Sequence, residues 1–387
     1  MRVLLSCLQG LKRHPIASYE HWRLSLSNGC EEASMEFVEI PGVDWAEALT
    51  YPPGKELDFW RAHTWEAVLD FVRREHARQP LDFFLCYLYP QQVEVAAIIE
   101  LQRLGIPCVN FFCDNVREFY HLPVEYHPFA LHWVPEFEAL PLYRQAGLPH
   151  IHAPMPCWVP PELRCLPQAE TELATFLGSP DLLRRDLLGR ALNAGADFVI
   201  RGYGWTGKKE KLPSNTMPQG SIASTIANQF NLIQSQGVRG LGCKIVDRVW
   251  PLRAPAMPDS RVFPPVSSDD YSRISREAIV TIGVNRVPTA RRSHRNPLTY
   301  SRLRDLEAPM LGACYLTEWT EGLSQLYELG TEIETYRTPE ELCAKISDLK
   351  RDPTRRQSLR QRGQKRALAD HSVARSLIRI QQKLGLS

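Results

Sequence analysis

The sequence predicts an α/β protein made of two halves, each built on a parallel β-sheet. The chain has 387 residues, which is more than one ordinary hydrophobic core organises. In both halves, short apolar runs alternate with stretches of helical periodicity. Such alternation is typical of parallel sheets covered by helices on both sides. A segment dense in proline separates the two series.

Composition and charge exclude several classes of protein. Hydrophobic residues make up 44% of the chain and charged residues 23%, values typical of a globular protein. The formal net charge of +2 gives no electrostatic reason to expect a nucleic-acid partner. No apolar stretch approaches the roughly 20 residues that a membrane-spanning helix needs. The ten cysteines contain no C-x-x-C pair, so neither a zinc site nor a disulfide framework is indicated. We therefore expect a soluble protein of the reducing cytoplasm.

The first half, residues 1–155, contains a regular series of strand-like and helical segments. The most marked is Leu81–Tyr89, an almost continuous apolar and aromatic run of the kind found in strands buried on both faces. The other expected strands are Met1–Cys7, Phe37–Ile40, Cys108–Cys113, Phe129–Val134 and His150–Ala153. Helices are expected over Tyr19–Leu26, Thr64–Arg74 and Val93–Leu104.

Prolines divide the chain at residues 156–170, which we interpret as a linker because proline density fixes an extended connection. Alternation restarts over residues 171–370. The expected strands there are Leu173–Leu177, Phe198–Arg201, Ala278–Ile282, Ala313–Leu316 and Glu332–Tyr336. Thr338, Pro339 and Glu341 predict the start of a helix. Residues 206–260 interrupt the alternation and are expected to form an insertion, and residues 371–387 a final helix.

Ligands of such sheets bind at the carboxyl ends of the strands, so the turns that follow the strands are the candidate sites. Gly178 and Ser179 lie between a strand and a helix, where backbone amides suit a phosphate. Arg184 and Arg185 follow in the first turns of that helix. An ordinary glycine turn beside solvated arginines is the alternative.

A second turn of this kind contains Gly202, Gly204 and Trp205. Glycines allow the backbone to approach a ligand closely, and the tryptophan ring could flank a nucleotide base. An ordinary turn is again the alternative. The spacing is not the G-x-G-x-x-G fingerprint, so a nicotinamide cofactor is not indicated.

The stretch Thr299–Glu307 is expected to be helical, with an interruption at Pro309. Helical spacing would then place Tyr300, Arg304 and Glu307 on one side. An arginine suits a diphosphate, and a carboxylate can accept hydrogen bonds from both hydroxyls of a ribose. A surface Arg–Glu pair is the alternative.

Two further groups follow strands. Glu321, Gly322 and Leu323 could present backbone amides to a ligand or simply cap a helix. His14, Asp114 and His121 are the candidates for a base that takes a proton from an acceptor hydroxyl. For each of these three, a purely structural role is the alternative.

The segment from Ala278 to about Ile380 resembles the spore-maturation (CgeB-like) proteins within the group 1 glycosyltransferases of GT-B fold. The resemblance rests on the order T-x-S-R-L-R-D-L-E-A followed by G-A-x-x-L-T-E-W-x-E-G-L and E-I-x-x-Y. The F-L-G-S turn at Phe176–Ser179 and the R-G-Y-G-W turn at Arg201–Trp205 match in kind and order. The first half is similar more loosely, through Trp22, the Leu81–Tyr89 strand and Asp114.

The resemblance implies two facing Rossmann-like domains with parallel sheets. It implies that a nucleotide-diphospho-sugar donor binds the C-terminal domain, that the acceptor binds the N-terminal domain, and that the last helix crosses back to the N-terminal domain. It assigns Glu307 to the ribose, Arg304 to the donor region and Gly322 with its neighbours to the diphosphate or sugar. No metal or other cofactor is implied. Retaining relatives carry a second glutamate eight residues earlier, where this chain has Thr299, so retention and inversion both stay open.

The leading hypothesis is a glycosyltransferase that moves a hexose from a nucleotide-diphospho-sugar to a hydroxyl of a glycan, a lipid-linked acceptor or a small molecule. The alternatives are a catalytically weak GT-B binding or scaffold protein and a nucleotide-sugar epimerase.

Basic residues gather near the C-terminus. A solvated helix face is the plain interpretation, and a peripheral contact with anionic lipid at the inner membrane face is the alternative, since basic residues near such a surface gain roughly 1 kcal/mol each. The run consists of Lys350, Arg351, Arg355, Arg356, Arg360, Arg362, Lys365 and Arg366.

Overall fold

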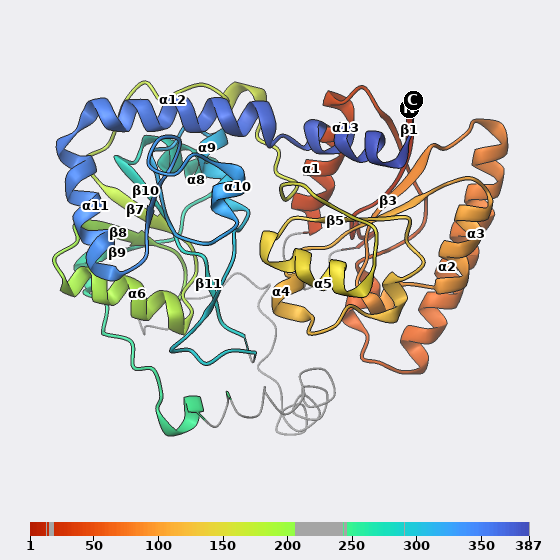
Figure 1. The fold of residues 1–387 in the computed structure, drawn as a ribbon, viewed down its shortest axis with the longest axis horizontal. Coiled ribbons are helices and arrows are strands. Elements are labelled where there is room, and N and C mark those ends of the chain that lie inside the picture. The colour runs from red at the N-terminus through yellow and green to blue at the C-terminus, as the bar shows by residue number, and fades with distance from the viewer. Residues whose placement is uncertain (13, 15–18, 206–242, 244–245, 290, 387) are drawn as a thin grey trace. The chain divides into compact units, whose positions relative to one another are not determined.

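The computed structural model describes residues 1–12, 14, 19–205, 243, 246–289 and 291–386. The chain forms two compact units (Figure 1). The first comprises residues 1–158 together with 371–387, and the second comprises residues 159–370.

The first unit contains a six-stranded parallel sheet of order β2-β1-β3-β4-β5-β6. Its strands are β1 (Arg2–Ser6), β2 (Glu36–Glu39), β3 (Phe83–Tyr87), β4 (Cys108–Phe111), β5 (Leu131–Val134) and β6 (His150–His152). All six match strands predicted from the sequence. Residues of β1 and β3 are fully or almost fully buried, since helices cover both faces of the sheet.

Figure 1 shows α2 and α3 on one side of this sheet and α1 on the other. The helices are α1 (Tyr19–Glu32), α2 (Lys55–Arg78), α3 (Val95–Arg103), α4 (Asn115–Glu118), α5 (Leu140–Ala146) and α13 (Val373–Leu384), with 3-10 turns at Glu47–Thr50, Pro90–Gln92, Val124–Tyr126 and Phe137–Ala139. Helix α13 packs closely on α1. A Cβ atom at Gly29 of α1 would lie only 2.2 Å from a methyl group of Val373, so the absence of a side chain at Gly29 allows this approach.

The second unit contains another six-stranded parallel sheet, of order β14-β13-β10-β7-β8-β9. Its strands are β7 (Ala174–Leu177), β8 (Phe198–Arg201), β9 (Val262–Phe263), β10 (Val280–Gly283), β13 (Tyr315–Glu318) and β14 (Glu334–Tyr336). The chain starts at β7, adds β8 and β9 on one side, and then adds β10, β13 and β14 on the other. The strand order therefore reverses between β7 and β10.

The helices of the second unit are α6 (Leu182–Asn193), α8 (Ser268–Glu277), α9 (Arg304–Met310), α10 (Leu323–Leu326), α11 (Pro339–Arg351) and α12 (Pro353–Asp370), with 3-10 turns at Pro161–Leu163 and Asp259–Arg261. The predicted start of α11 is confirmed, since the Thr338 hydroxyl accepts a hydrogen bond from the Glu341 amide at 3.2 Å. A small antiparallel pair, β11 (Arg286–Val287) and β12 (Leu298–Thr299), was not predicted.

The prediction of a helix over Thr299–Glu307 is wrong at both ends. Thr299 belongs to β12, the helix begins at Arg304, and it continues through Pro309 to Met310. Pro309 is tolerated because it removes only the amide that would bind the Asp305 carbonyl, and the Tyr327 hydroxyl donates to that carbonyl instead, at 2.8 Å.

Two arginines of the basic run, Arg356 and Arg360, are buried in the second unit. Arg360 is only 1% exposed and donates to the Glu170 carboxylate at 3.0 Å and to three backbone carbonyls. Arg356 donates to the same carboxylate at 2.7 Å. A solvated helix face is therefore the wrong interpretation for these two arginines, whereas lipid contact through the remaining basic residues stays a prediction.

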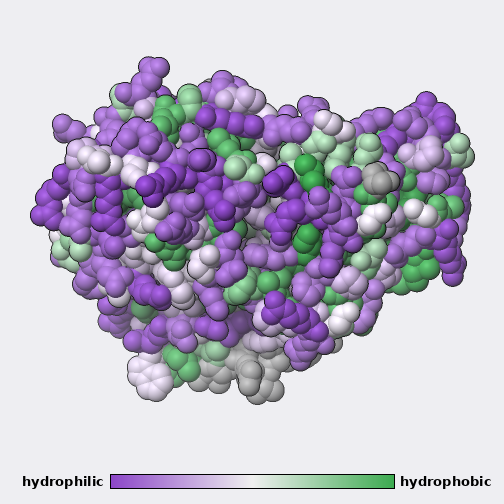
Figure 2. Space-filling model, turned by 45° about the horizontal axis from the view of Figure 1, so that its top comes forward, coloured by the Kyte–Doolittle hydropathy of each residue, from purple (hydrophilic) through white to green (hydrophobic). Residues whose placement is uncertain are grey.

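Most of the predicted insertion at residues 206–260 lies outside the described residues. Among the helices of the described ranges, none combines the length and the apolar character needed to cross a bilayer. The face of the molecule in Figure 2 is mainly hydrophilic, with smaller hydrophobic areas between the polar ones.

Candidate functional site

A cavity of about 360 Å³ lies in the second unit at the carboxyl ends of β7 and β10. This is the point where the strand order reverses, which is the usual ligand position in an open parallel sheet. Its lining comes from the turn after β7, the first turn of α6, α8, the loop after β10 and the start of α9. The lining residues are Phe176, Leu177, Gly178, Ser179, Arg184, Tyr271, Val284, Asn285, Arg302, Leu303, Arg304 and Glu307.

The turn after β7 is fixed by close backbone packing. A Cβ atom at Gly202 would lie 2.1 Å from the carbonyl oxygen of Gly178, so no other residue fits there without displacement of the backbone. The same carbonyl accepts a hydrogen bond from the Trp205 indole at 2.7 Å. Gly202 and Trp205 thus hold the turn that lines the cavity, without lining it themselves.

Three arginines from two segments converge on the cavity: Arg184, Arg302 and Arg304. Arg184 donates to the Ser179 carbonyl at 2.9 Å, and Arg304 donates to the Leu177 carbonyl. Burial lowers the pKa of Arg184, and the like charges of Arg302 and Arg304 lower it further, although Asp181 opposes them. Such mutual repulsion favours an anionic ligand between the three groups.

Glu307 faces the same space and is held by a tyrosine. The Tyr271 hydroxyl donates to Glu307 Oε2 at 2.5 Å. Burial, together with the neighbouring carboxylate, raises the pKa of Tyr271 despite the opposing effect of Arg304, so the phenol keeps its proton and remains a donor. The Arg304 guanidinium lies 5.4 Å from the Tyr271 ring centroid, a cation–π distance.

A buried carboxylate braces the segment that carries two of the arginines. Asp305 is fully buried and accepts hydrogen bonds from the Tyr315 hydroxyl at 2.8 Å, the Thr317 hydroxyl at 2.9 Å and the Arg302 amide at 2.9 Å. Burial raises its pKa, although these hydrogen bonds oppose the rise. Asp305 thereby ties the start of α9 to β13.

The loop after β10 is braced in the same way. Glu318, at the end of β13, accepts from the Asn285 amide at 3.1 Å and pairs with the Arg286 guanidinium at 2.5 Å. The Asn285 side chain donates to the Glu318 carbonyl at 2.8 Å. These contacts fix the backbone next to the cavity.

The cavity brings together five of the residues that the sequence predicted for donor binding: Gly178, Ser179, Arg184, Arg304 and Glu307. It also contains groups that sequence reasoning missed, chiefly Tyr271, Asn285 and Arg302.

Other predicted donor residues lie elsewhere. Arg185 donates to the Trp205 carbonyl at 3.0 Å and covers the Trp205 ring, and that ring is 2% exposed within the core. Tyr300 has no exposed surface. Outside the cavity lining are Arg185, Gly202, Gly204, Trp205, Tyr300, Glu321, Gly322 and Leu323.

The predicted base candidates lie in the first unit. His14 is buried, with its Nε2 2.8 Å from the Asp44 carboxylate. Asp114 directly precedes α4 with a left-handed backbone (φ 64°) and is partly exposed. His121 is exposed.

A buried carboxyl group that the sequence did not suggest follows β5 in the first unit. Glu136 is fully buried and accepts from the Asn115 amide at 3.1 Å and from the Asn115 side chain at 2.7 Å. Burial raises its pKa to about 8, with a smaller contribution from Asp114 against the hydrogen bonds of Asn115. Glu136 holds α4 just after Asp114.

Comparison with protein families gives one match. Residues 232–382 match a family model described as glycosyl transferase-like. This range contains Tyr271, Arg304 and Glu307, whereas Gly178 and Arg184 precede it. The comparison with curated proteins found no match.

Solved structures resemble this chain over its whole length. Sucrose-phosphate synthase from Thermosynechococcus elongatus is 12% identical, with a TM-score of 0.57 over 99% of this chain and 98% of that one. A glycosyltransferase from Rickettsia africae is 9% identical, with a TM-score of 0.55 over 100% and 99%. HepE from Anabaena, solved in complex with UDP and glucose, is 13% identical, with a TM-score of 0.51 over 99% and 99%.

These comparisons establish two points. The chain has the GT-B fold class predicted from its sequence, with two parallel six-stranded sheets. Residues 232–382 match a family model of glycosyl transferase-like proteins.

Proposed function

We propose that this chain is a glycosyltransferase that moves a hexose from a nucleotide-diphospho-sugar to a hydroxyl acceptor and binds the donor in the cavity between β7 and β10. The observation on which the proposal rests is the convergence of Arg184, Arg302, Arg304 and Glu307 in one cavity of about 360 Å³. A diphosphate needs several positive groups, and a ribose suits a carboxylate that accepts from two hydroxyls.

The chemistry that this arrangement supports is stabilisation of the leaving diphosphate. As the bond between the sugar and the diphosphate breaks, negative charge grows on the phosphate oxygens. Fixed guanidinium groups in a partly buried cavity stabilise that charge more in the transition state than in the ground state. On this proposal the arginines supply the charge that a metal ion supplies elsewhere, so transfer is expected to persist in a metal chelator.

The comparisons support this proposal in two ways. The matched family is glycosyl transferase-like, and its range contains Arg304 and Glu307. HepE, which has the same fold, was solved with UDP and glucose, and UDP-glucose is therefore the first donor to test. We further propose membership of the CgeB-like group, action in the cytoplasm and an acceptor bound by the first unit, with Asp114, His14 or His121 as the base.

The proposal is tested by thermal unfolding of the purified chain with UDP, GDP, dTDP and CMP, without added metal. A ligand at 100 times its dissociation constant adds about 2.7 kcal/mol of stability. We expect one nucleoside diphosphate to stabilise the wild type and the exposed-site control Glu172→Ala, but not Glu307→Ala. Equal stabilisation of Glu307→Ala would show that the donor site lies elsewhere.

A second candidate, a GT-B binding protein with little turnover, is favoured by Thr299. This residue occupies the position of a donor-binding glutamate in the family the sequence resembles, and it lies in β12. Hydrolysis or transfer of the donor sugar by the purified chain would remove this candidate, whereas nucleotide binding without turnover would favour it.

A further inference from the structure

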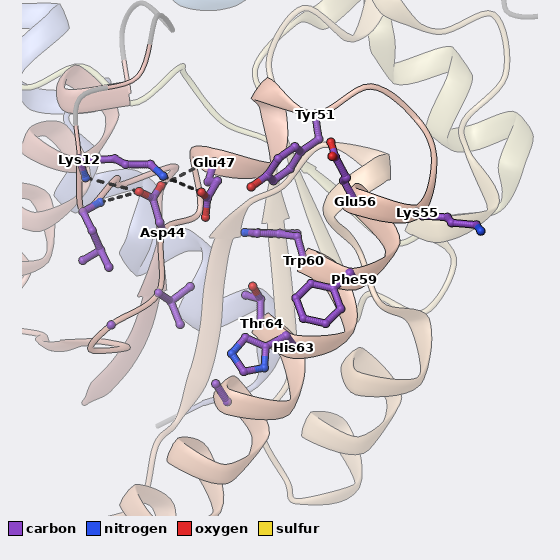
Figure 3. A pocket seen from close by; sticks show the side chains of 14 residues that line it. Lys12, Asp44, Glu47, Tyr51, Lys55, Glu56, Phe59, Trp60, His63 and Thr64 are labelled. Carbon is purple, nitrogen blue, oxygen red and sulfur yellow. Dashed lines mark hydrogen bonds and ion pairs between the residues drawn. The ribbon is translucent and has the colours of Figure 1, made fainter.

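A second cavity, of about 620 Å³, lies in the first unit. Its lining comes from the loops that follow β1 and β2 and from the first four turns of α2 (Figure 3). The volume falls within the roughly 300–1,000 Å³ of small-molecule sites and exceeds that of a single hexose ring. No part of the donor proposal uses it.

One wall of this cavity is aromatic. Tyr51, Phe59, Trp60 and His63 all contribute to it. The rings of Phe59 and His63 are stacked, with centroids 6.0 Å apart and planes that differ by 9°, and Phe59 is 74% exposed. Together with Tyr51 and Trp60, the exposed ring of Phe59 forms a group of aromatic side chains on one cavity rather than a single apolar residue on the surface.

The opposite wall is polar. The Lys12 ammonium donates to Glu47 Oε1 at 2.7 Å. Figure 3 shows the Trp60 indole edge-on, with its nitrogen directed to the side of the cavity where Lys12, Asp44 and Glu47 lie. The cavity therefore offers apolar ring faces on one side and hydrogen-bonding groups on the other.

The polar wall is held rigidly in place by Asp44. Its carboxylate accepts from the Leu11 amide at 3.0 Å and the Glu47 amide at 3.0 Å, and it lies 2.8 Å from His14 Nε2. These contacts join the loop after β1 to the loop after β2. A wall fixed in this way loses little conformational entropy when a ligand binds.

The charged groups of the lining are close to balance. The lining contains two lysines, Lys12 and Lys55, and three carboxylates, Asp44, Glu47 and Glu56, and Lys12 pairs with Glu47 at 2.7 Å. The excess of one carboxylate disfavours a phosphate, and an ammonium ligand would have to compete with Lys12 for Glu47. A neutral ligand with hydroxyl groups meets neither penalty.

We infer that this cavity binds a neutral sugar, with the C–H face of a hexose ring on Phe59 and its neighbours and the hydroxyl groups at Glu47 and Lys12. A carboxylate accepts hydrogen bonds from sugar hydroxyls, and an ammonium donates to them. The inference concerns binding alone and goes beyond the proposed transfer reaction, because it holds whether or not the bound sugar is an acceptor.

Saturation-transfer NMR on the full chain tests the inference, with maltose, cellobiose and lactose as neutral probes and choline and inorganic phosphate as charged ones. We expect at least one disaccharide to bind. Phe59→Ala, which removes an exposed ring, and Glu47→Gln, which removes the carboxylate charge, should each weaken that binding about tenfold.

Matched controls separate loss of the site from loss of the fold. Ile99→Ala changes an exposed apolar residue of α3, and Glu66→Gln changes an exposed carboxylate of α2 that lies outside the lining; both should bind sugar as the wild type does. Stabilisation by nucleotide should be unchanged in Phe59→Ala, so that failure here and failure of the donor proposal are told apart. Absence of any disaccharide signal, retention of the signal in both variants, or binding of choline or phosphate alone would overturn the inference.

Discussion

Both units contain a parallel six-stranded sheet, with different strand orders, and they differ in the chemistry at the ends of their strands. In the second unit, Arg184, Arg302, Arg304 and Glu307 meet in a cavity of about 360 Å³ at the reversal of strand order. In the first unit, the larger cavity follows β1 and β2 and has an aromatic wall. On our two proposals, the loops after the strands provide both cavities, and the side chains of those loops determine which ligand each cavity accepts.

Each unit also contains a buried carboxyl group that fixes nearby backbone, and the two groups differ in their hydrogen-bond donors. Asp305 in the second unit receives hydrogen bonds from two hydroxyls and an amide. Glu136 in the first unit receives them from the backbone amide and the side chain of Asn115. Burial raises both pKa values, and it raises that of Glu136 to about 8, against an ordinary value of 4.5.

Stability should therefore depend on pH through the first unit. Between about pH 4.5 and pH 8, folded Glu136 holds a proton that the unfolded chain has lost, so stability falls as the pH rises across this window. Glu136→Gln, which cannot ionise, should remove this loss. Relative to the wild type, the variant should gain on the order of 3–4 kcal/mol between about pH 5 and pH 8.

Urea unfolding of the wild type and Glu136→Gln at several pH values measures this difference, with the exposed Glu66→Gln as control. Parallel stability profiles for Glu136→Gln and the wild type would mean that Glu136 is already ionised in the folded protein.

Two consecutive arginines offer a sharper comparison within the second unit. Arg184 lines the cavity, whereas Arg185 donates to the carbonyl of Trp205. Arg184→Ala should weaken binding of a nucleoside diphosphate by about 2–3 kcal/mol, because a hydrogen bond to a charged group is lost. Arg185→Ala should instead lower the unfolding temperature and leave nucleotide affinity nearly unchanged.

Isothermal titration with the stabilising nucleotide and thermal unfolding of both variants make this comparison, with the exposed Arg362→Ala on α12 as control. If Arg185→Ala weakened nucleotide binding as much as Arg184→Ala, the assignment of Arg184 to ligand binding and of Arg185 to stability would be wrong.

The sheets were predictable from the sequence, and the way in which segments distant in sequence pack was not. Every predicted strand is present. A strand that is buried on both faces of a sheet, such as β3, needs a run of apolar residues, and that run is visible in the sequence. The missed strands β9, β11 and β12 have two residues each. So short a pairing leaves no periodic pattern to detect.

The candidate site was predictable where it lies in turns after strands. Gly178 and Arg184 follow from that rule, and Arg304 and Glu307 from helical spacing and from the resemblance. Tyr271 contacts Glu307 across 36 positions, through packing of α8 on α9 that no local pattern reveals. The prediction that the Trp205 ring flanks a nucleotide base is wrong, since the ring is buried in the core. The sequence does not show whether an aromatic residue after a glycine turn faces the core or a ligand.

The smallest expected effect concerns that missed tyrosine. Tyr271→Phe keeps the ring beside Arg304 but removes the hydroxyl that holds Glu307 at 2.5 Å. Losing this one hydrogen bond should weaken nucleotide binding by about 1 kcal/mol, which is about fivefold. Because the second unit fixes its charged groups before the ligand arrives, the loss should appear as weaker affinity without a large fall in unfolding temperature. Titration of Tyr271→Phe against the partly exposed control Tyr203→Phe measures it. Tighter binding by Tyr271→Phe would mean instead that the tyrosine competes with the ribose for Glu307, and the carboxylate would then be freed by the ligand rather than set in place for it.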